Sequence, residues 1–193
     1  MSDAPPIGQA ALLLAEVERL KRDLDAAQAK ITELESRADF DPLLDVLNRR
    51  GFERELKRSL AYIKRYGTIA ALIYLDLDGF KAINDKHGHA AGDALLKAVA
   101  KRLVSQVRAS DIVARLGGDE FAVLIWNASS SDAAVKALEL EEGIALTSVE
   151  HGDATLHVGA SAGIAILNPD DTTDNVIDSA DRAMYARKRA PRG

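Results

Sequence analysis

The sequence predicts an α/β fold of the α+β-like kind, in which helices surround a mixed central sheet and a coiled-coil helix precedes it. Apolar residues first recur at heptad spacing between Leu13 and Ala38. Strand-length apolar runs then alternate with helical patterns. Finally, the pair Gly117-Gly118 joins two such runs directly and predicts an antiparallel hairpin, whereas helical connections permit parallel neighbours. Together these features predict a mixed sheet.

Composition limits the function classes. With 193 residues, 47% of them hydrophobic, the chain can bury one core of ordinary size. The absence of cysteine excludes disulfides and thiolate metal sites. A formal charge of −5 argues against broad attachment to nucleic acid or anionic membrane, so we expect any phosphate-bearing partner to be small. The start of the chain lacks the pattern of a secretory signal and its apolar runs are short, so we expect a soluble cytoplasmic protein.

We expect residues 1–10 to be disordered and residues 11–38 to form a coiled-coil dimerisation and input helix. β-Branched residues occupy two a positions and leucine occupies d positions, a pattern that favours parallel pairs. Glu16 at a g position would face Lys21 of a second chain. The alternative is one amphipathic helix that lies on its own domain. The seam consists of Val17, Leu24 and Ile31 at a, and Leu13, Leu20 and Leu34 at d.

The globular domain is expected to begin at residue 39, because Phe40-Asp41-Pro42 breaks helical geometry where the heptads end. Its first helix should stop at Gly67. Apolar periodicity and turn residues predict the remaining elements. They are helices over 48–66, 79–84, 132–146 and 173–189, strands over 69–77, 111–116, 120–126 and 156–167, and a polar turn over 85–89 that is followed by a longer helix through 107.

Two acidic clusters adjoin very apolar strands. Asp76 and Asp78 end the first strand on one side of its pleat, and Asp119-Glu120 occupies the hairpin turn. Carboxylates converging on one sheet edge supply the hard oxygen ligands that Mg²⁺ prefers, and they leave positions for phosphate oxygens. The alternative for either cluster alone is a solvated turn. Together the clusters predict a metal-nucleotide site.

The segment after the first strand carries further candidates. Lys81 would neutralise phosphate charge, while Asn84 and Asp93 offer the donor and acceptor groups that a guanine edge requires. Taken singly, each is also typical of a surface or capping residue. His87 and His89 lack the spacing of a helical zinc pair. The sequence contains no G-x-x-x-x-G-K-[ST] loop, which excludes a P-loop enzyme of the usual form.

Several long motifs occur in a recognisable order, and they resemble the GGDEF family of diguanylate cyclases. The resemblance covers about residues 39 to 193. It implies a central sheet similar to the palm of nucleotidyl cyclases and polymerases. It also implies an enzyme that condenses two GTP molecules into cyclic di-GMP and two pyrophosphates. The motifs are Asp76-Leu-Asp-Gly-Phe-Lys-Ala-Ile-Asn-Asp85, Gly88-His-Ala-Ala-Gly-Asp93, Arg115-Leu-Gly-Gly-Asp-Glu-Phe121, Ser161-Ala-Gly-Ile-Ala165 and Ala180-Asp-Arg-Ala-Met-Tyr185.

The resemblance also assigns roles. It implies Mg²⁺ (or Mn²⁺) as cofactor, with Glu120 as a further metal ligand or as a group that helps to deprotonate the attacking hydroxyl. The glycines of the hairpin permit close approach of the backbone to the nucleotide. In the ending Arg187-Lys188-Arg189-Ala190-Pro191-Arg192, proline stands where the family has glycine. The implied sites are Asp76, the carbonyl of Leu77, Asp119 and Glu120 for metal; Lys81, Lys188 and Arg192 for phosphates; and Asn84, His89, Asp93, Gly117 and Gly118 for the rest of the nucleotide.

Two further segments concern regulation. Arg108-Ala-Ser-Asp111 matches the family's R-x-x-D inhibitory site for its product, although the two side chains could simply pair with each other. The family's second inhibitory arginine should fall near residues 138–141, which read Leu-Glu-Leu-Glu. Leu44 and Asp45 replace the threonine and glycine of the family's D-x-L-T-G-L segment, which couples the input helix to the domain.

The family's reaction requires two domains, each holding one GTP, so we expect a homodimer through the coiled coil. The sequence reveals no sensory domain, so we expect regulation through a partner protein on the N-terminal helix, through expression or through the product. The rival interpretation is a catalytically silent module that binds GTP or cyclic di-GMP as a receptor or dimerisation platform. The third interpretation is a coiled-coil adaptor whose globular domain is only structural. It would not explain the presence of the polar groups named above.

Overall fold

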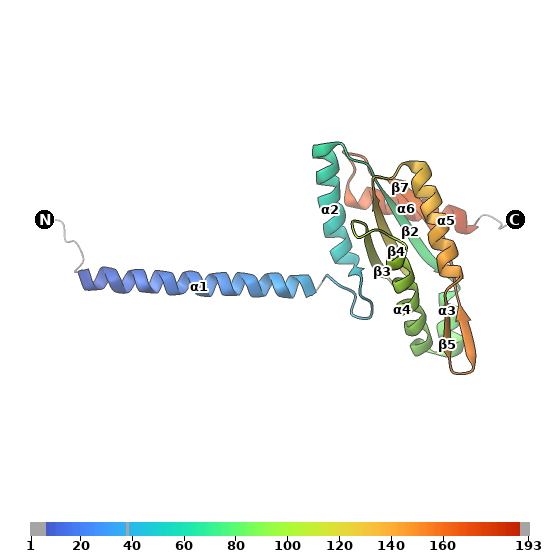
Figure 1. Cartoon of the computed structure of the whole chain (residues 1–193), viewed down its shortest axis with the longest axis horizontal. Coiled ribbons are helices and arrows are strands. Elements are labelled where there is room, and N and C mark those ends of the chain that lie inside the picture. Colours follow the sequence, from blue (N-terminus) through green and yellow to red (C-terminus); the bar gives the residue numbers. More distant parts are fainter. Residues whose placement is uncertain (1–6, 38, 190–193) are drawn as a thin grey trace. The chain divides into compact units, whose positions relative to one another are not determined.

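The computed structural model describes residues 7–37 and 39–189 (Figure 1). The chain divides into two compact units, residues 1–38 and residues 39–193. The first contains helix α1 (Ile7–Arg37), which begins before the end of the segment expected to be disordered. Residues 1–6 of that segment lie outside the described residues. No helix in the described ranges combines the length and apolarity needed to cross a bilayer.

Helix α1 carries large apolar side chains in contact with solvent. Leu13 is 59% exposed, Leu20 52% and Leu24 57%, and all three lie on the predicted seam. Arg19 pairs along the helix with Glu16 at 2.6 Å and with Asp23 at 3.0 Å. The side chains at residues 29–38, which include part of the predicted seam, lie outside the described residues. An exposed apolar stripe of this kind favours burial against another surface.

The second unit contains the predicted elements together with three short strands that the sequence did not indicate. The predicted strand over 156–167 is divided at Val158, because residues 156 and 157 belong to a hairpin closed at Gly152 and the long strand begins only at Gly159. The predicted turn over 85–89 is also shorter, since only Gly88 separates the helix that ends at His87 from the helix that begins at His89. The order is β1 (Leu47–Asn48), α2 (Arg49–Tyr66), β2 (Ala70–Asp78), α3 (Phe80–His87), α4 (His89–Ser105), β3 (Ile112–Gly117), β4 (Glu120–Trp126), α5 (Ser130–Ala145), β5 (Ser148–His151), β6 (Ala154–His157), β7 (Gly159–Ile166) and α6 (Thr173–Arg189).

Five strands form the central sheet in the order β1-β3-β4-β2-β7, and β5 pairs with β6 in a separate hairpin. β1 and β3 are parallel, while the other pairs of the central sheet are antiparallel. The predicted mixed sheet is therefore confirmed, with antiparallel pairing predominant. In the β2–β4 register Asp76 lies opposite Glu120, and in the β2–β7 register it lies opposite Ser161. The acidic end of β2 is thereby brought to the hairpin between β3 and β4.

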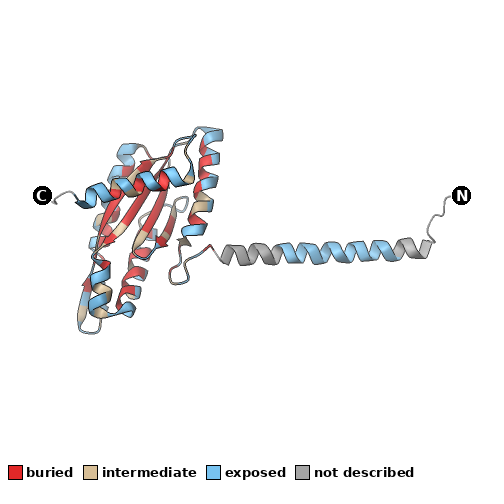
Figure 2. Cartoon of the chain, turned by 180° about the vertical axis from the view of Figure 1, so that it is seen from behind, coloured by how far each residue is buried: buried red, intermediate tan, exposed pale blue. Residues whose placement is uncertain are grey.

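Helices cover both faces of the sheet. Alternate residues of β2 point to opposite faces, so each face has its own apolar core. One core packs β2 residues such as Leu75 against α4 and α5. The other packs residues such as Leu72 against α2 and α6. Figure 2 shows the buried strands behind α6. Because Asp76 shares the pleat side of Leu72, its carboxylate lies on the face covered by α2 and α6.

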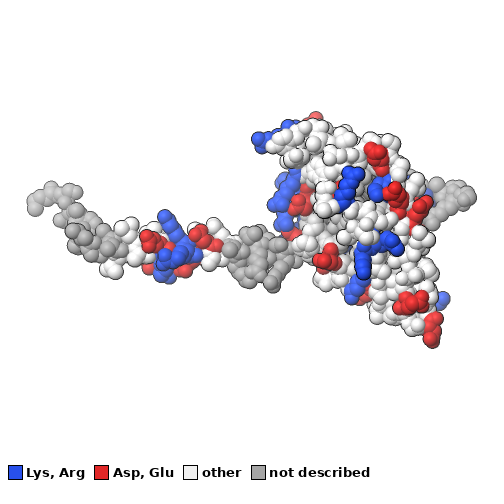
Figure 3. Space-filling view, in the orientation of Figure 1, with Lys and Arg blue, Asp and Glu red and all other residues white. Residues whose placement is uncertain are grey.

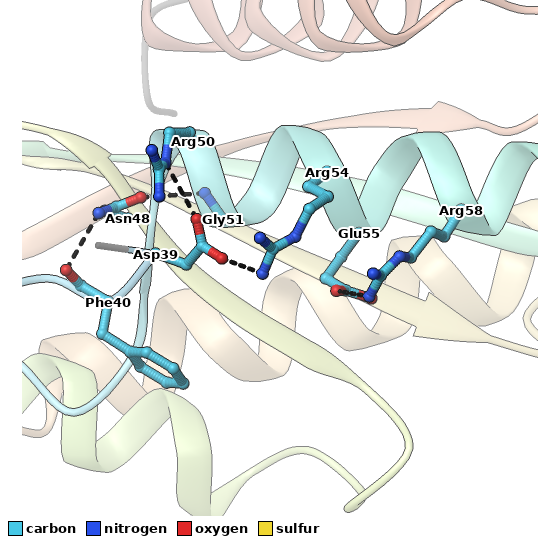
Figure 4. A network of polar contacts seen from close by, with 8 residues as sticks. All are labelled: Asp39, Phe40, Asn48, Arg50, Gly51, Arg54, Glu55 and Arg58. Carbon is cyan, nitrogen blue, oxygen red and sulfur yellow. Dashed lines mark hydrogen bonds and ion pairs between the residues drawn. The ribbon is translucent and has the colours of Figure 1, made fainter. Parts of the chain in front are cut away.

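The start of the globular unit is fixed to α2 by a polar network (Figure 4). Asp39 is 1% exposed and accepts a hydrogen bond of 3.0 Å from Arg50 Nε. Arg54 forms a second ion pair with its carboxylate. The backbone carbonyl of Asp39 accepts from the N–H of Asn48 at 2.8 Å, and the Asn48 side chain caps α2 by accepting from Gly51 N. The segment that follows α1 is thus bound to the first turns of α2.

Candidate active site

The two acidic clusters predicted from the sequence meet in the structure. Asp76 on β2 lies directly opposite Glu120 on β4, and the N–H of Leu77 donates to the carbonyl of Asp119 at 3.1 Å. The side chain of Asp78 accepts a hydrogen bond of 2.9 Å from Ser161 Oγ on β7. Antiparallel pairing of β2 with β4 therefore brings both acidic clusters to one end of the sheet.

A lysine from the last helix completes this cluster. Lys188 Nζ forms an ion pair with Asp76 and lies 3.8 Å from Asp78 Oδ1. Partial burial of the ammonium would lower the pKa of Lys188, but the hydrogen bond with Asp76 and the charges of Asp76, Asp78 and Asp119 raise it above its ordinary value. The lysine that the family resemblance assigned to the phosphates thus contacts Asp76, which the same resemblance assigned to the metal.

Glu120 has two neighbours that the sequence did not single out. Arg49 Nη2 lies 3.6 Å from Glu120 Oε2, and Arg49 Nε donates to the Leu116 carbonyl at 3.0 Å. Tyr74 hydrogen-bonds to Glu120, and burial together with this carboxylate raises the pKa of the Tyr74 hydroxyl well above its ordinary range. Tyr74 is therefore a neutral hydrogen-bond donor beside Glu120, and Arg49 connects the first turn of α2 to both sides of the hairpin.

The hairpin tip has the conformation that its glycines permit. Gly117 has φ 154° and Gly118 has φ 50°, backbone angles that residues other than glycine rarely adopt. Arg115, which precedes this tip, donates to the Gly118 carbonyl from Nε at 2.9 Å and from Nη2 at 2.8 Å. Its Nη1 also lies 3.3 Å from Asp41 Oδ2. The sequence indicated no role for Arg115, and the structure shows that its side chain links Asp41 to the hairpin tip.

The candidate guanine-binding residues lie on α3 and α4. Asn84 Oδ1 is buried and has no hydrogen-bond partner among the described residues. A Cβ atom at position 92 would lie 1.9 Å from this oxygen, so the absence of a side chain at Gly92 leaves the room that the Asn84 amide occupies. His89 begins α4 and Asp93 lies one turn further, both exposed, and Lys81 is exposed on α3. A buried acceptor without a partner is a group available to a ligand.

The candidate product-binding residues form a turn. The Asp111 carboxylate accepts from Arg108 N at 3.0 Å and from Trp126 N at 3.1 Å, and Asp111 N donates to the Arg108 carbonyl at 2.9 Å. The contact between Arg108 and Asp111 therefore runs through the backbone of Arg108 rather than through an ion pair between the side chains. Residues 190–193, which include the candidate Arg192, lie outside the described residues.

The donor set fits a divalent cation that is shared with a phosphate. Asp76, Asp119, Glu120 and the Leu77 carbonyl offer hard oxygen atoms, the ligand type of Mg²⁺. Within residues 7–37 and 39–189, no group of three or more acidic or histidine side chains is arranged to hold a metal on its own. The Lys188 ammonium already supplies positive charge against Asp76. A cation here would need further ligands from its substrate, as Mg²⁺ commonly does in nucleotide sites.

Charge on the face of the globular unit drawn in Figure 3 does not favour a large polyanion. On the face drawn in Figure 3, lysine and arginine side chains are interspersed with aspartate and glutamate over the globular unit. Mixed charge of this kind produces no broad field of one sign.

Comparison with known protein families gives a match to the model described as diguanylate cyclase, GGDEF domain, over residues 38–193. The chain belongs to the GGDEF family. The family resemblance predicted from the motifs is therefore confirmed, and so is the fold class.

Curated members of the GGDEF family resemble this chain over most of its length. The diguanylate cyclase TpbB of Pseudomonas aeruginosa is 37% identical over 194 residues, which covers 93% of this chain and 44% of TpbB. The probable diguanylate cyclase DgcE of Escherichia coli is 36% identical over 173 residues, covering 89% of this chain and 16% of DgcE. The chain thus spans less than half the length of these two relatives.

Solved GGDEF structures have the same fold. A sensory box/GGDEF family protein from Caulobacter crescentus is 38% identical, with a TM-score of 0.73 and coverage of 78% of this chain and 97% of that one. The coiled coil and GGDEF domain of DgcB from the same organism, solved in complex with c-di-GMP, is 27% identical, with a TM-score of 0.79 and coverage of 93% and 96%. The Pseudomonas aeruginosa diguanylate cyclase SiaD, solved with its activator SiaC, is 28% identical, with a TM-score of 0.76 and coverage of 95% and 72%.

Proposed function

We propose that this GGDEF chain is a diguanylate cyclase that condenses two GTP molecules into cyclic di-GMP and two pyrophosphates. One observation carries the proposal: Asp76, Asp119 and Glu120, which the family resemblance assigned to metal binding, converge on a glycine-containing hairpin beside Lys188. Membership of a family described as diguanylate cyclase supports the same reaction. GTP as substrate would place that reaction in the cytoplasm.

The reaction would join the 3′-oxygen of each GTP to the α-phosphorus of the other, so that two phosphodiester bonds form, and each hydroxyl loses a proton while each α-phosphorus loses pyrophosphate. Mg²⁺ or Mn²⁺, held by Asp76, the Leu77 carbonyl, Asp119 and Glu120, would lower the pKa of the hydroxyl and neutralise charge on the leaving pyrophosphate. Glu120 lies within the polar neighbourhood of Arg49 and Tyr74, and it is the carboxylate that we assign to the attacking hydroxyl.

The remaining residues bind and orient the substrate. Lys81, Lys188 and Arg192 would neutralise the phosphates. Asn84 and Asp93 would recognise the guanine edge, with His89 as a further contact, and the unpaired Asn84 Oδ1 supports this assignment. Gly117 and Gly118 would let the hairpin backbone approach the nucleotide closely.

Each domain supplies half of the catalytic centre in this proposal, because one domain holds one GTP. A homodimer through a parallel α1 coiled coil would raise the effective concentration of the second half. The exposed seam residues Leu13, Leu20 and Leu24 support that role for α1. The activator bound to SiaD supports a protein partner as one source of regulation, which we place on the N-terminal helix.

Cyclic di-GMP would also act as an inhibitor at Arg108 and Asp111. The c-di-GMP complex of the similar DgcB domain supports binding of this product by the fold. Exposed Arg108 could contact phosphate, while Asp111 holds the turn through the backbone N–H groups of Arg108 and Trp126. We expect weak inhibition, because residues 138–141 supply no arginine.

The test is an incubation of the intact chain with GTP and Mg²⁺, with products identified by chromatography and mass spectrometry. We expect cyclic di-GMP from the intact chain and none from the Asp119→Ala, Glu120→Ala variant. A control with exposed acids outside the site, Glu142→Ala with Asp153→Ala, should keep its activity. Binding of GTP without any product from the intact chain would favour the catalytically silent module instead, and no binding would favour an adaptor.

A further inference from the structure

The residue before Lys188 makes contacts of a different kind. Arg187 Nη1 donates to the carbonyl of Ala162 at 3.1 Å, and its Nη2 lies 3.1 Å from Glu141 Oε2. The other carboxylate oxygen of Glu141 accepts from the N–H of Ala162 at 2.7 Å. Glu141 and Arg187 therefore form an ion pair with each other, and together they bind the N–H and the carbonyl of Ala162.

This three-residue contact lies at the edge of the sheet. β7 is the last strand in the order of the central sheet, so its outer side has no neighbouring strand among the described elements. Backbone groups on such an edge need other partners. Glu141 belongs to α5 on one face of the sheet, and Arg187 belongs to α6 on the other. The pair thus joins the two helical layers around the edge strand.

The same contact determines where the end of α6 lies. Successive residues of an α-helix point about 100° apart, so Arg187 and Lys188 reach in different directions from one turn. Arg187 reaches outward to the edge at Ala162, while Lys188 reaches inward to Asp76 and Asp78 on β2. The last turn of α6 is therefore fixed on both sides of β7.

We propose that Glu141 and Arg187 are positioning residues for Lys188, and that they set the affinity of the site for a nucleoside triphosphate. This inference rests on the proposed function, because it concerns the lysine assigned there to the phosphates. The pair is suited to positioning rather than to overall stability, since the Arg187 side chain is 47% exposed and partly exposed ion pairs contribute little to folding.

The experiment compares the intact chain with Arg187→Ala, Arg187→Lys and Glu141→Gln, each alone and combined with Lys188→Ala. KM and kcat for GTP are measured, together with equilibrium binding of a non-reactive GTP analogue with Mg²⁺. Arg187→Ala should weaken nucleotide binding and raise KM about fivefold while kcat changes less. In the Lys188→Ala background the same change should have almost no effect, and Arg187→Lys should restore part of the affinity.

Arg182→Ala is the matched control, because Arg182 lies on α6 and donates to the Asp178 carbonyl of the same helix. Unchanged nucleotide affinity in Arg187→Ala would overturn the inference. So would an equal loss of affinity with and without Lys188, because the arginine would then act independently of it. If the intact chain binds the analogue but makes no cyclic product, the proposed function fails while the binding comparison still decides the inference. If the intact chain binds no nucleotide, both fail.

Discussion

Lys188 and Asp76 lie 112 residues apart in the chain and form an ion pair at the acidic end of β2. The ammonium group lies against the carboxylate that the family resemblance assigns to a metal ion. A divalent cation that binds Asp76 would compete with this contact, because two cations close to one carboxylate repel each other. Lys188 would then be released toward the phosphates of the nucleotide.

Lys188→Met should therefore affect the two ligands in opposite directions. Without nucleotide, Mn²⁺ should bind about fivefold more tightly, since removing a competing, partly exposed ion pair is worth about 1 kcal/mol. Binding of the GTP analogue should weaken, because one phosphate contact is lost. Calorimetric titration measures both, and Lys86→Met, an exposed lysine on α3, is the control. Weaker Mn²⁺ binding in Lys188→Met would contradict the competition.

Gly92→Ala should impair recognition of the guanine base with little effect on the fold. The added methyl group would occupy the space of Asn84 Oδ1, which lies 1.9 Å from the position of a Cβ atom there, so the amide must turn away. We expect affinity for GTP to fall about tenfold and the preference for GTP over ATP to shrink. Competition binding with the two nucleotides measures the preference. The exposed neighbour Ala90→Ser serves as control, and an unchanged GTP preference in Gly92→Ala would remove Asn84 from the base-binding site.

Asp39→Asn should destabilise the globular unit. Asp39 is 1% exposed and pairs with Arg50 and Arg54, and hydrogen bonds to a charged group typically contribute more than neutral ones (Figure 4). We expect a loss of about 1–3 kcal/mol in the free energy of unfolding, measured by urea denaturation of the full chain. Asp45→Asn, an exposed carboxylate in the same segment, should change it by less than about 0.5 kcal/mol. Equal effects of the two substitutions on the free energy of unfolding would show that the contacts of Asp39 do not fix the start of the globular unit to α2.

The elements that the sequence predicted well are those with long periodic patterns. The helix over 48–66 and its stop at Gly67 follow directly from apolar spacing and a glycine cap, and the structure confirms them. β1 has two residues and depends on its parallel pairing with β3, which no local pattern reveals. The hairpin of β5 and β6 has four-residue strands with mixed polarity, too short for alternation to distinguish them from a loop.

The candidate site was predictable as far as residue types and order along the chain allow. Strand ends and turn residues indicated that Asp76 and Asp119 would share one edge of the sheet, and the register confirms their proximity. Long-range side-chain partners were not predictable in this way. The contacts of Arg115 with Asp41, and of Arg187 with Glu141, join elements whose relative placement depends on the whole fold.

The most direct test of the account concerns the dependence of cyclic di-GMP formation on α1. Specific activity with GTP and Mg²⁺ is measured over a range of protein concentrations for the intact chain and for Leu20→Glu with Leu24→Glu. Ala15→Glu with Ala26→Glu, which adds the same charges outside the seam, is the control. We predict constant specific activity for the intact chain and control, and activity of the seam variant that is low when dilute and rises with concentration. Absence of cyclic di-GMP from the intact chain, or equal activity of the seam variant at every concentration, would contradict the account.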